Sequence, residues 1–401
     1  MRRQRALGPE ADLMTRRYEL DWLRVLLFAL LVPHHVAVGF VDWGVDIYGF
    51  VNNQLAGDGM TLFIYWSHSW RLPSLFMIAG IGTWFLTRRG TGPRFIGGRL
   101  LRLLVPALFG TAVLNVFGGY AIALMTSEPP GFPRFWWLWL TEPVPRQVQH
   151  LWFLFNLAIY TVLCWPLFAL WRGQAHPVRP MVLVAGLVTL SALAVVVLKP
   201  HAPAIAGDNY QFALYLVFFA GGYLIGSMSE EVLDWARRWA WLLLAGAVLL
   251  FAVKITLLTL TLIDDVPTGQ ALAAGGWEPA GLSPPHATAF SVIEAATAWA
   301  WCLAALGLAV RFLARPSRLL SHLNRAVFPV YVLHFPVTLI GLALATQISW
   351  PWWVEFLGLL VFVYGVTWML WRLADRLGAT AYLVGGKPLG SALAATARRA
   401  G

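Results

Sequence analysis

Apolar stretches recur along the whole chain, and shorter segments that carry most of the charged residues separate one stretch from the next. Each stretch reaches about 20 residues, the length that an α-helix needs to cross the hydrocarbon core of a bilayer. The pattern predicts ten transmembrane helices, at 20–42, 61–86, 101–125, 150–171, 181–199, 211–228, 240–263, 290–312, 328–347 and 353–373. We therefore expect an all-α, polytopic membrane protein.

The ten predicted helices form one membrane domain of residues 20–375, between an N-terminal tail of residues 1–19 and a C-terminal tail of residues 376–401. The first helix contains charged residues and lacks a small-residue cleavage site, so we interpret it as a retained helix rather than a signal peptide. The longest connections, 127–149 and 264–289, are too short for a separate soluble domain.

Composition supports a membrane location, because 59% of the residues are hydrophobic and only 12% are charged. A soluble protein carries about 25% charged residues. The two cysteines, Cys164 and Cys302, fall inside predicted helices, where a thiol behaves as a small hydrophobic group. Two lone cysteines predict neither a disulfide framework nor a zinc site.

The basic residues predict the orientation of the helices. Nearly all Lys and Arg residues outside the ten helices lie in the two tails and the even-numbered loops, whereas the odd-numbered loops contain only Arg134 and Arg146. This is the positive-inside pattern, so we expect both termini to be cytoplasmic and the protein to lie in a bacterial inner membrane. The net charge of +10 does not indicate nucleic-acid binding, because the charges are dispersed over short loops.

The first predicted helix carries ionisable residues at membrane depth. Arg24 and His35 are eleven residues apart, which places them within about 20° of one helix face and about 16 Å apart along the axis. Asp21 precedes Arg24 by one turn and can pair with it. Pro33 cannot donate to the carbonyl of Ala29, so we expect the helix to bend just before His34 and His35.

Other ionisable residues fall at similar depth in later helices. His68 and Arg71 share a face of the second helix, His150 opens the fourth, and Glu294 lies one turn into the eighth. Intramembrane ionisable groups are candidates for function, so together with His35 they predict a polar cavity that is open to the outer side. For Lys254, in the outer third of the seventh helix, we expect the side chain to extend to the lipid headgroups.

For two groups of residues the sequence leaves a structural and a functional interpretation open. His34 and His35 are either functional or serve only as hydrogen-bonding partners of neighbouring helices. Arg99 and Arg102, one turn apart at a cytoplasmic helix start, either bind a phosphate group together or contact anionic lipids.

Familiar catalytic signatures are missing from the chain. It contains no Gly-rich phosphate loop followed by lysine, no Gly-x-Ser-x-Gly nucleophile elbow and no His-Glu-x-x-His metal motif. The glycines of Ala79–Trp84 end a predicted helix, so they indicate helix packing rather than dinucleotide binding. The spacing of the histidines predicts no metal site.

Three features together resemble the membrane-bound acyltransferase 3 family. One is a first-helix arginine followed, after ten residues, by a histidine, here Arg24 and His35. Another is an Arg-x-x-Arg pair after the second helix, here Arg99 and Arg102, and the third is the ten-helix core. Within the family, ELDWLRV, WRLPSLFMIAG, HLWFLFN and YVLHFPV are similar to members that succinylate periplasmic glucans.

The resemblance implies transfer of an acyl group from cytoplasmic acyl-CoA to a hydroxyl group of a glycan or glucan at the outer face. Succinyl-CoA is then the favoured donor and acetyl-CoA the next, with no metal. His35 would be the general base and Arg71 would stabilise the oxyanion, while His34 would orient His35 or a neighbouring helix.

The remaining implied roles concern binding. The coenzyme would be bound by Arg24, Arg88, Arg89, Arg99 and Arg102, with His334 either lining its path or packed structurally. The acceptor would be bound by His68, His150 and Glu294.

A transporter or flippase of a lipid-linked sugar or an amphipathic solute is the alternative, since it would also need many helices and a polar core. It would not need a histidine aligned with an interfacial arginine, and the chain lacks the internal repeats of many transporters. The sequence leaves open direct transfer or an acyl-histidine intermediate, and a monomer or an oligomer.

Overall fold

The computed structural model describes residues 17–88, 90–141, 148–171, 178–198, 209–262, 284–378 and 380–386. All regular structure in these ranges is helical. The elements are α2 (Tyr18–Ala29), α3 (Leu31–Val38), η1 (Asp42–Gly44), α4 (Val45–Tyr48), α5 (Asp58–Thr87), α6 (Pro93–Phe109), η2 (Gly110–Leu114), α7 (Asn115–Thr126), α8 (Phe132–Thr141), η4 (Gln149–Leu151), α9 (Trp152–Leu163), α10 (Trp165–Trp171), α11 (Pro180–Leu198), α12 (Asn209–Ser227), α13 (Ser229–Leu262), α15 (Pro284–Phe312), α16 (Arg318–Ala345), α17 (Trp352–Arg376) and α18 (Thr380–Leu383).

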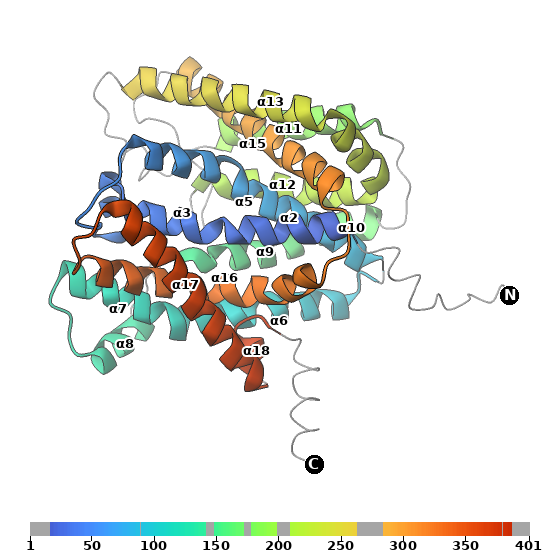
Figure 1. Ribbon diagram of the computed structural model, residues 1–401. Helices are drawn as coiled ribbons and strands as arrows, with labels where there is room; N and C mark the ends of the chain where they lie inside the picture. The colour runs from blue at the N-terminus through green and yellow to red at the C-terminus, as the bar shows by residue number, and fades with distance from the viewer. Residues whose placement is uncertain are drawn as a thin grey trace, which may run out of the picture.

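The long helices run roughly along one direction and form a bundle (Figure 1). Each of the ten stretches predicted to span the membrane is largely helical over its described residues, with turns at some ends such as 39–41 and 346–347. Within the described ranges, 7 helices are long and apolar enough to cross a membrane, or up to 8 if the bent pair of α9 and α10 is one span. The chain is therefore an all-α multi-pass membrane protein.

The prediction of ten spans goes beyond this number because of two helices. The polar residues of α5, among them His68 and Arg71, lower its hydropathy, and the apolar segment of α12, Gln211–Ser227, is short. The count of ten and the cytoplasmic location of both termini stay predictions.

The first span is interrupted where Pro33 predicts. α2 ends at Ala29 and α3 begins at Leu31, with Leu30 between them. The carbonyl oxygen of Ala29, which lacks its helical donor because residue 33 is proline, accepts a hydrogen bond from the hydroxyl group of Tyr364 on α17. Tyr18–Val38 still forms one candidate span, so the bend expected before the histidine pair stays a prediction, while α17 satisfies the exposed carbonyl.

Glycines bring α5 and α12 close together. A Cβ atom on Gly80 would lie 2.0 Å from the carbonyl oxygen of Phe219, and one on Gly222 would lie 2.1 Å from the carbonyl oxygen of Met77. Small residues of this kind allow two membrane helices to pack backbone against backbone. The interpretation of the glycines of Ala79–Trp84 as packing residues is confirmed for Gly80, whereas a Cβ atom on Gly82 would meet nothing within 4 Å.

Three elements position the candidate site. α16 packs against α2, α3, α7 and α17, while α5 packs against α3, α12 and α15. α3 therefore lies between α5 and α16, and its two histidines can reach the polar side chains of both.

Candidate active site

Five histidines that are far apart in the sequence form one group of imidazole rings, which we call the histidine cluster: His34, His35, His68, His150 and His334. The ring of His35 lies 5.4 Å from that of His334, and the ring of His334 lies 4.9 Å from that of His150, between centroids. The ring of His34 lies 5.4 Å from that of His35 and 6.1 Å from that of His68. The structure thus brings together the histidines that the sequence assigned to three different roles.

His334 lies among the rings that were expected to act on the thioester and the acceptor. Its ring is 5.4 Å from that of His35, although the resemblance implied a place for it along the coenzyme path. The expected role of His334 toward a coenzyme is untested.

His34 points toward α5 rather than toward the imidazole nitrogens of His35. Its Nδ1 atom lies 2.7 Å from the hydroxyl oxygen of Ser67, which itself donates to the carbonyl of Ile64 at 3.1 Å. Since the one hydroxyl proton of Ser67 is used in this way, Nδ1–H of His34 is the donor of the first bond. His34 is buried and joins α3 to α5.

Tyr331 fixes the tautomers of two other histidines. Its backbone carbonyl oxygen lies 2.7 Å from Nδ1 of His334 and 3.0 Å from Nε2 of His150. A carbonyl oxygen can only accept, so both nitrogens carry their protons. The remaining nitrogens, Nε2 of His334 and Nδ1 of His150, are buried acceptors that have no hydrogen-bond partner among the described residues.

His35 is the partly exposed member of the α3 pair. Its Nδ1 atom lies 3.3 Å from the hydroxyl oxygen of Tyr48, and this hydroxyl group donates to the backbone carbonyl of His35 at 3.0 Å. Its ring also packs edge-on against Phe335, at 4.9 Å between centroids. Within the described part of the chain, Nε2 of His35 makes no hydrogen bond.

Arg71 is a buried cation next to these rings. Its exposed fraction is 2%, and its Nε and Nη1 atoms have no hydrogen-bond partner among the described residues. It lies within electrostatic range of four members of the histidine cluster: His34, His35, His68 and His334. No described carboxylate forms an ion pair with it. An uncompensated buried cation is costly, so the site suits an anion or a developing negative charge.

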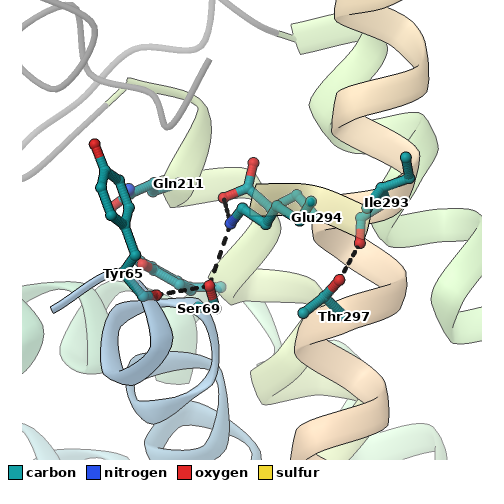
Figure 2. A network of polar contacts seen from close by, with 8 residues as sticks. Tyr65, Ser69, Gln211, Ile293, Glu294 and Thr297 are labelled. Carbon is teal, nitrogen blue, oxygen red and sulfur yellow. Dashed lines mark hydrogen bonds and ion pairs between the residues drawn. The ribbon is translucent and has the colours of Figure 1, made fainter. Parts of the chain in front are cut away.

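Lys254 does not extend to the headgroups, so that prediction was wrong. Its side chain is fully buried, its Nζ atom lies 3.7 Å from Oε1 of Glu294, and it donates to the hydroxyl oxygen of Ser69 at 3.2 Å (Figure 2). Ser69 in turn donates to the carbonyl of Tyr65 at 2.8 Å. The pair joins α13, α15 and α5, and an acidic partner removes the need for the ammonium group to reach water.

Glu294 therefore lies beside the histidine cluster rather than within it. Its Oε1 atom pairs with Lys254, whereas its buried Oε2 atom has no hydrogen-bond partner among the described residues. His68, the residue before Ser69, is in electrostatic range of Lys254. The network is thus continuous with the cluster through α5, and the role of Glu294 toward an acceptor stays a prediction.

The arginines expected to bind a coenzyme differ in their surroundings. Arg24 donates to Asp21 at 2.7 Å, which confirms that expected pair, and to Asn324 of α16 at 2.6 Å. Arg99 is half-buried and donates to Thr161 of α9 at 2.8 Å, whereas Arg88 and Arg102 are exposed. Arg89 lies outside the described residues.

Sequence reasoning missed the residues that orient the histidines. Tyr48 and Ser67 carry no motif, and Tyr331 acts through its backbone carbonyl, which sequence does not single out. The position of Tyr331 one turn before His334 was the only available signal. No group of three or more His, Cys, Asp or Glu side chains in the described ranges can hold a metal ion.

Comparison with known proteins defines the class. The family profile described as "Acyltransferase domain" matches residues 17–372. The chain belongs to this family, the acyltransferase 3 family, and acyltransferase activity is the activity that the family implies.

Individual relatives are distant. Glucans biosynthesis protein C of Salmonella paratyphi B is 23% identical over 388 residues, which cover 93% of this chain and 95% of that protein. The protein of the same name from Salmonella enteritidis is equally similar. The one from Escherichia coli is 26% identical over 155 residues, or 37% of this chain and 38% of that protein. No solved structure is significantly similar to the chain.

Proposed function

We propose that the protein transfers an acyl group from acyl-CoA to a hydroxyl group of a glycan, with His35 as the general base. The observation that carries the proposal is the Nε2 atom of a partly exposed His35, which has no described hydrogen-bond partner and lies within electrostatic range of Arg71, whose Nε and Nη1 atoms also have no described partner. Attack on a thioester requires a base whose lone pair is available and a cation that is not already paired with a carboxylate.

In the proposed reaction, Nε2 of His35 accepts the proton of the acceptor hydroxyl while the hydroxyl oxygen attacks the thioester carbonyl carbon. The tetrahedral intermediate then expels coenzyme A as a thiolate, and the imidazolium group of His35 returns the proton to the sulfur atom. The products are an ester and free coenzyme A, so no further reactant is needed.

Arg71 stabilises the negative charge that develops during this step. The thioester carbonyl oxygen becomes an oxyanion, and N–H groups that lie in a water-poor site stabilise such a charge strongly. Because Nε and Nη1 of Arg71 have no other described partner, they can donate to the oxyanion without first breaking a bond.

The donor would enter from the side of the bundle where α2 and α6 begin. Arg24 lies in the second turn of α2, and Arg99 and Arg102 lie in the second and third turns of α6, near enough to interact electrostatically. Guanidinium groups form charge-assisted bonds with phosphate, so they suit the phosphates of coenzyme A.

A succinyl group remains the favoured acyl group, and an acetyl group is the next. A dicarboxylic acyl group needs a cation for its distal carboxylate. Lys254 is paired with Glu294, whereas Arg71 has no described carboxylate partner, so the distal carboxylate is a second anion, besides the oxyanion, that Arg71 can meet. The names of the relatives support a glucan as the acceptor.

The test uses the purified protein in lipid vesicles, with radiolabelled succinyl-CoA or acetyl-CoA and a glucan oligosaccharide. Label transferred to the glucan and free thiol released in equal amounts is the expected result. His35→Ala should abolish both, since loss of a general base costs about 10²- to 10⁴-fold in rate.

Two results would contradict the proposal. Full activity of His35→Ala would remove His35 from the reaction. Absence of transfer and thiol release in the wild-type protein, with movement of labelled oligosaccharide across the vesicle membrane, would instead identify a transporter.

A further inference from the structure

The segment that follows α3 folds back over His35. α3 ends at Val38, after which η1 and α4 form a short compact turn that leads to Tyr48. The turn packs tightly onto the end of α3, because a Cβ atom on Gly44 would lie 1.9 Å from the carbonyl oxygen of Val38. The side chain of Tyr48 is only 3% exposed, and its ring packs against Phe335 at 5.8 Å between centroids.

The end of α3 leaves the carbonyl group of His35 available to Tyr48. In a regular helix the N–H group of Gly39 would donate to this carbonyl, but here it donates to Val36 at 3.0 Å. The hydroxyl group of Tyr48 takes its place and donates to the His35 carbonyl at 3.0 Å.

This bond determines which nitrogen of His35 carries the proton. A hydroxyl group has one proton, and a carbonyl oxygen can only accept, so the proton of Tyr48 lies in the bond to the backbone. The second contact, 3.3 Å between the Tyr48 oxygen and Nδ1 of His35, must then use the Nδ1–H group as its donor. The lone pair of His35 is left on Nε2.

We infer that Tyr48 is a positioning residue that holds His35 in the tautomer and orientation needed for general-base catalysis. The inference rests on the proposed acyl transfer and extends it. His34 was expected to orient either a neighbouring helix or His35 itself, and its Nδ1–H group bonds to Ser67 of the neighbouring α5 rather than to His35. In many enzymes a neighbouring group orients the catalytic base, and here that group is the neutral phenol of Tyr48.

A neutral phenol is well suited to this position. Burial raises the pKa of the Tyr48 hydroxyl above its ordinary value, so the group keeps its proton at physiological pH. A carboxylate would add a charge beside His35, whereas the phenol supplies one donor and one acceptor without a charge.

The test compares Tyr48→Phe with Tyr364→Phe. Both changes remove a tyrosine hydroxyl that donates to a backbone carbonyl of the first span, but only the Tyr48 hydroxyl contacts an imidazole nitrogen. We expect Tyr48→Phe to lower kcat about 10- to 100-fold with little change in KM for donor or acceptor, because the loss concerns orientation of the base. Tyr364→Phe should keep nearly full kcat.

A graded series tests the hydrogen bond itself. Replacement of Tyr48 by ring-fluorinated tyrosines weakens its oxygen as an acceptor without removing the side chain, so kcat should fall stepwise with the number of fluorine atoms. An equal kcat across the series, or an equal loss in Tyr48→Phe and Tyr364→Phe, would overturn the inference and leave the proposed acyl transfer intact.

A readout independent of turnover separates the two proposals. Diethyl pyrocarbonate modifies the unprotonated imidazole nitrogen, and mass spectrometry locates the product. Modification of His35 should be slower in Tyr48→Phe than in the wild type and in Tyr364→Phe. Equal rates in all three proteins would refute the role of Tyr48, whereas a slower rate would support it even if the wild type transferred no acyl group.

Discussion

The hydroxyl group of Tyr364 bonds to the carbonyl oxygen of Ala29, which Pro33 leaves without a helical donor. A free carbonyl in lipid is costly, so a proline in a membrane helix is tolerated where a neighbouring group satisfies it. Here the neighbour is α17, so the first span tolerates Pro33 without leaving the carbonyl of Ala29 unsatisfied.

The two adjacent histidines should respond differently to substitution. His34→Ala removes the bond to Ser67 and a contact between α3 and α5, so we expect measurable turnover with a lower melting temperature. His35→Ala should lose turnover by about 10²- to 10⁴-fold but keep donor binding, because the arginines remain. Acyl transfer in membranes at matched protein level measures the turnover of both variants. Binding of labelled acyl-CoA measures whether His35→Ala still binds the donor. Loss of transfer confined to His34→Ala would mean that the wrong histidine was chosen.

Replacement of Arg71 should impair catalysis more than insertion. The side chain is buried without an ion-pair partner in the described part of the chain, so Arg71→Leu removes an uncompensated charge and should leave expression and melting temperature unchanged or improved. Loss of one oxyanion donor typically costs about 10²- to 10³-fold in kcat, and Arg71→Lys should recover part of it.

A comparison of two donors shows which anion Arg71 meets. If it serves only the oxyanion, Arg71→Leu should slow transfer from succinyl-CoA and acetyl-CoA to the same extent. A loss confined to succinyl-CoA would place Arg71 at the distal carboxylate, and full activity with both donors would exclude either role.

The paired arginines of α6 should act on donor affinity. A charge-assisted bond to phosphate contributes roughly 1.5–3 kcal/mol, so Arg99→Ala and Arg102→Ala should each raise the KM for acyl-CoA at least about tenfold. Arg99→Ala should also lower the melting temperature, because Arg99 is half-buried and bonded to Thr161. Unchanged KM values in both variants would show that these arginines do not bind the donor and instead determine topology or contact lipids.

The buried pair of Lys254 and Glu294 should be far more sensitive to single substitution than to joint replacement. Either Lys254→Met or Glu294→Met leaves one buried charge unpaired, which costs about 3–5 kcal/mol of stability, whereas the double variant should recover most of it. Thermal unfolding in detergent measures the effect.

Another ion pair of α13 provides the control. Arg237 and Asp234 lie 3.4 Å apart on the surface, with exposed fractions of 47% and 61%. Asp234→Asn should change stability by about 1 kcal/mol or less, because exposed pairs contribute little. Equal effects at both pairs would mean that burial of Lys254 does not determine its contribution.

Local rules predicted much of the fold. Hydrophobic length located ten stretches that are largely helical in the described residues, and the missing N–H group of Pro33 predicted a carbonyl at Ala29 without a helical donor, which the structure shows bonded to Tyr364. The spacing of Asp21 and Arg24 predicted their ion pair. Each of these features depends on residues within a few turns of one helix.

The candidate site could be predicted only in part, because its geometry arises between helices. Sequence identified His35, Arg71 and His150 by their charge or polarity at membrane depth, without indicating which rings touch. The error at Lys254 has the same origin, since its partner Glu294 lies 40 residues further along the chain, on another helix. Helix boundaries read from hydropathy do not fix how neighbouring helices are staggered, so the contact between the rings of His334 and His35 could not be predicted.

The buried pair also constrains how the chain enters the membrane. During synthesis α13 emerges before α15, so for a time Lys254 has no Glu294 to pair with. A lone ammonium group at such depth opposes partition into lipid, so α13 should remain in the translocation channel, or at its edge, until α15 arrives and the two helices leave as a hairpin. Protein that lacks α15 would carry a helix with an exposed intramembrane charge, which is a feature that membrane quality-control proteases can recognise. Lys254, which contributes to packing in the folded protein, would thus also delay membrane insertion of α13 until α15 has been synthesised.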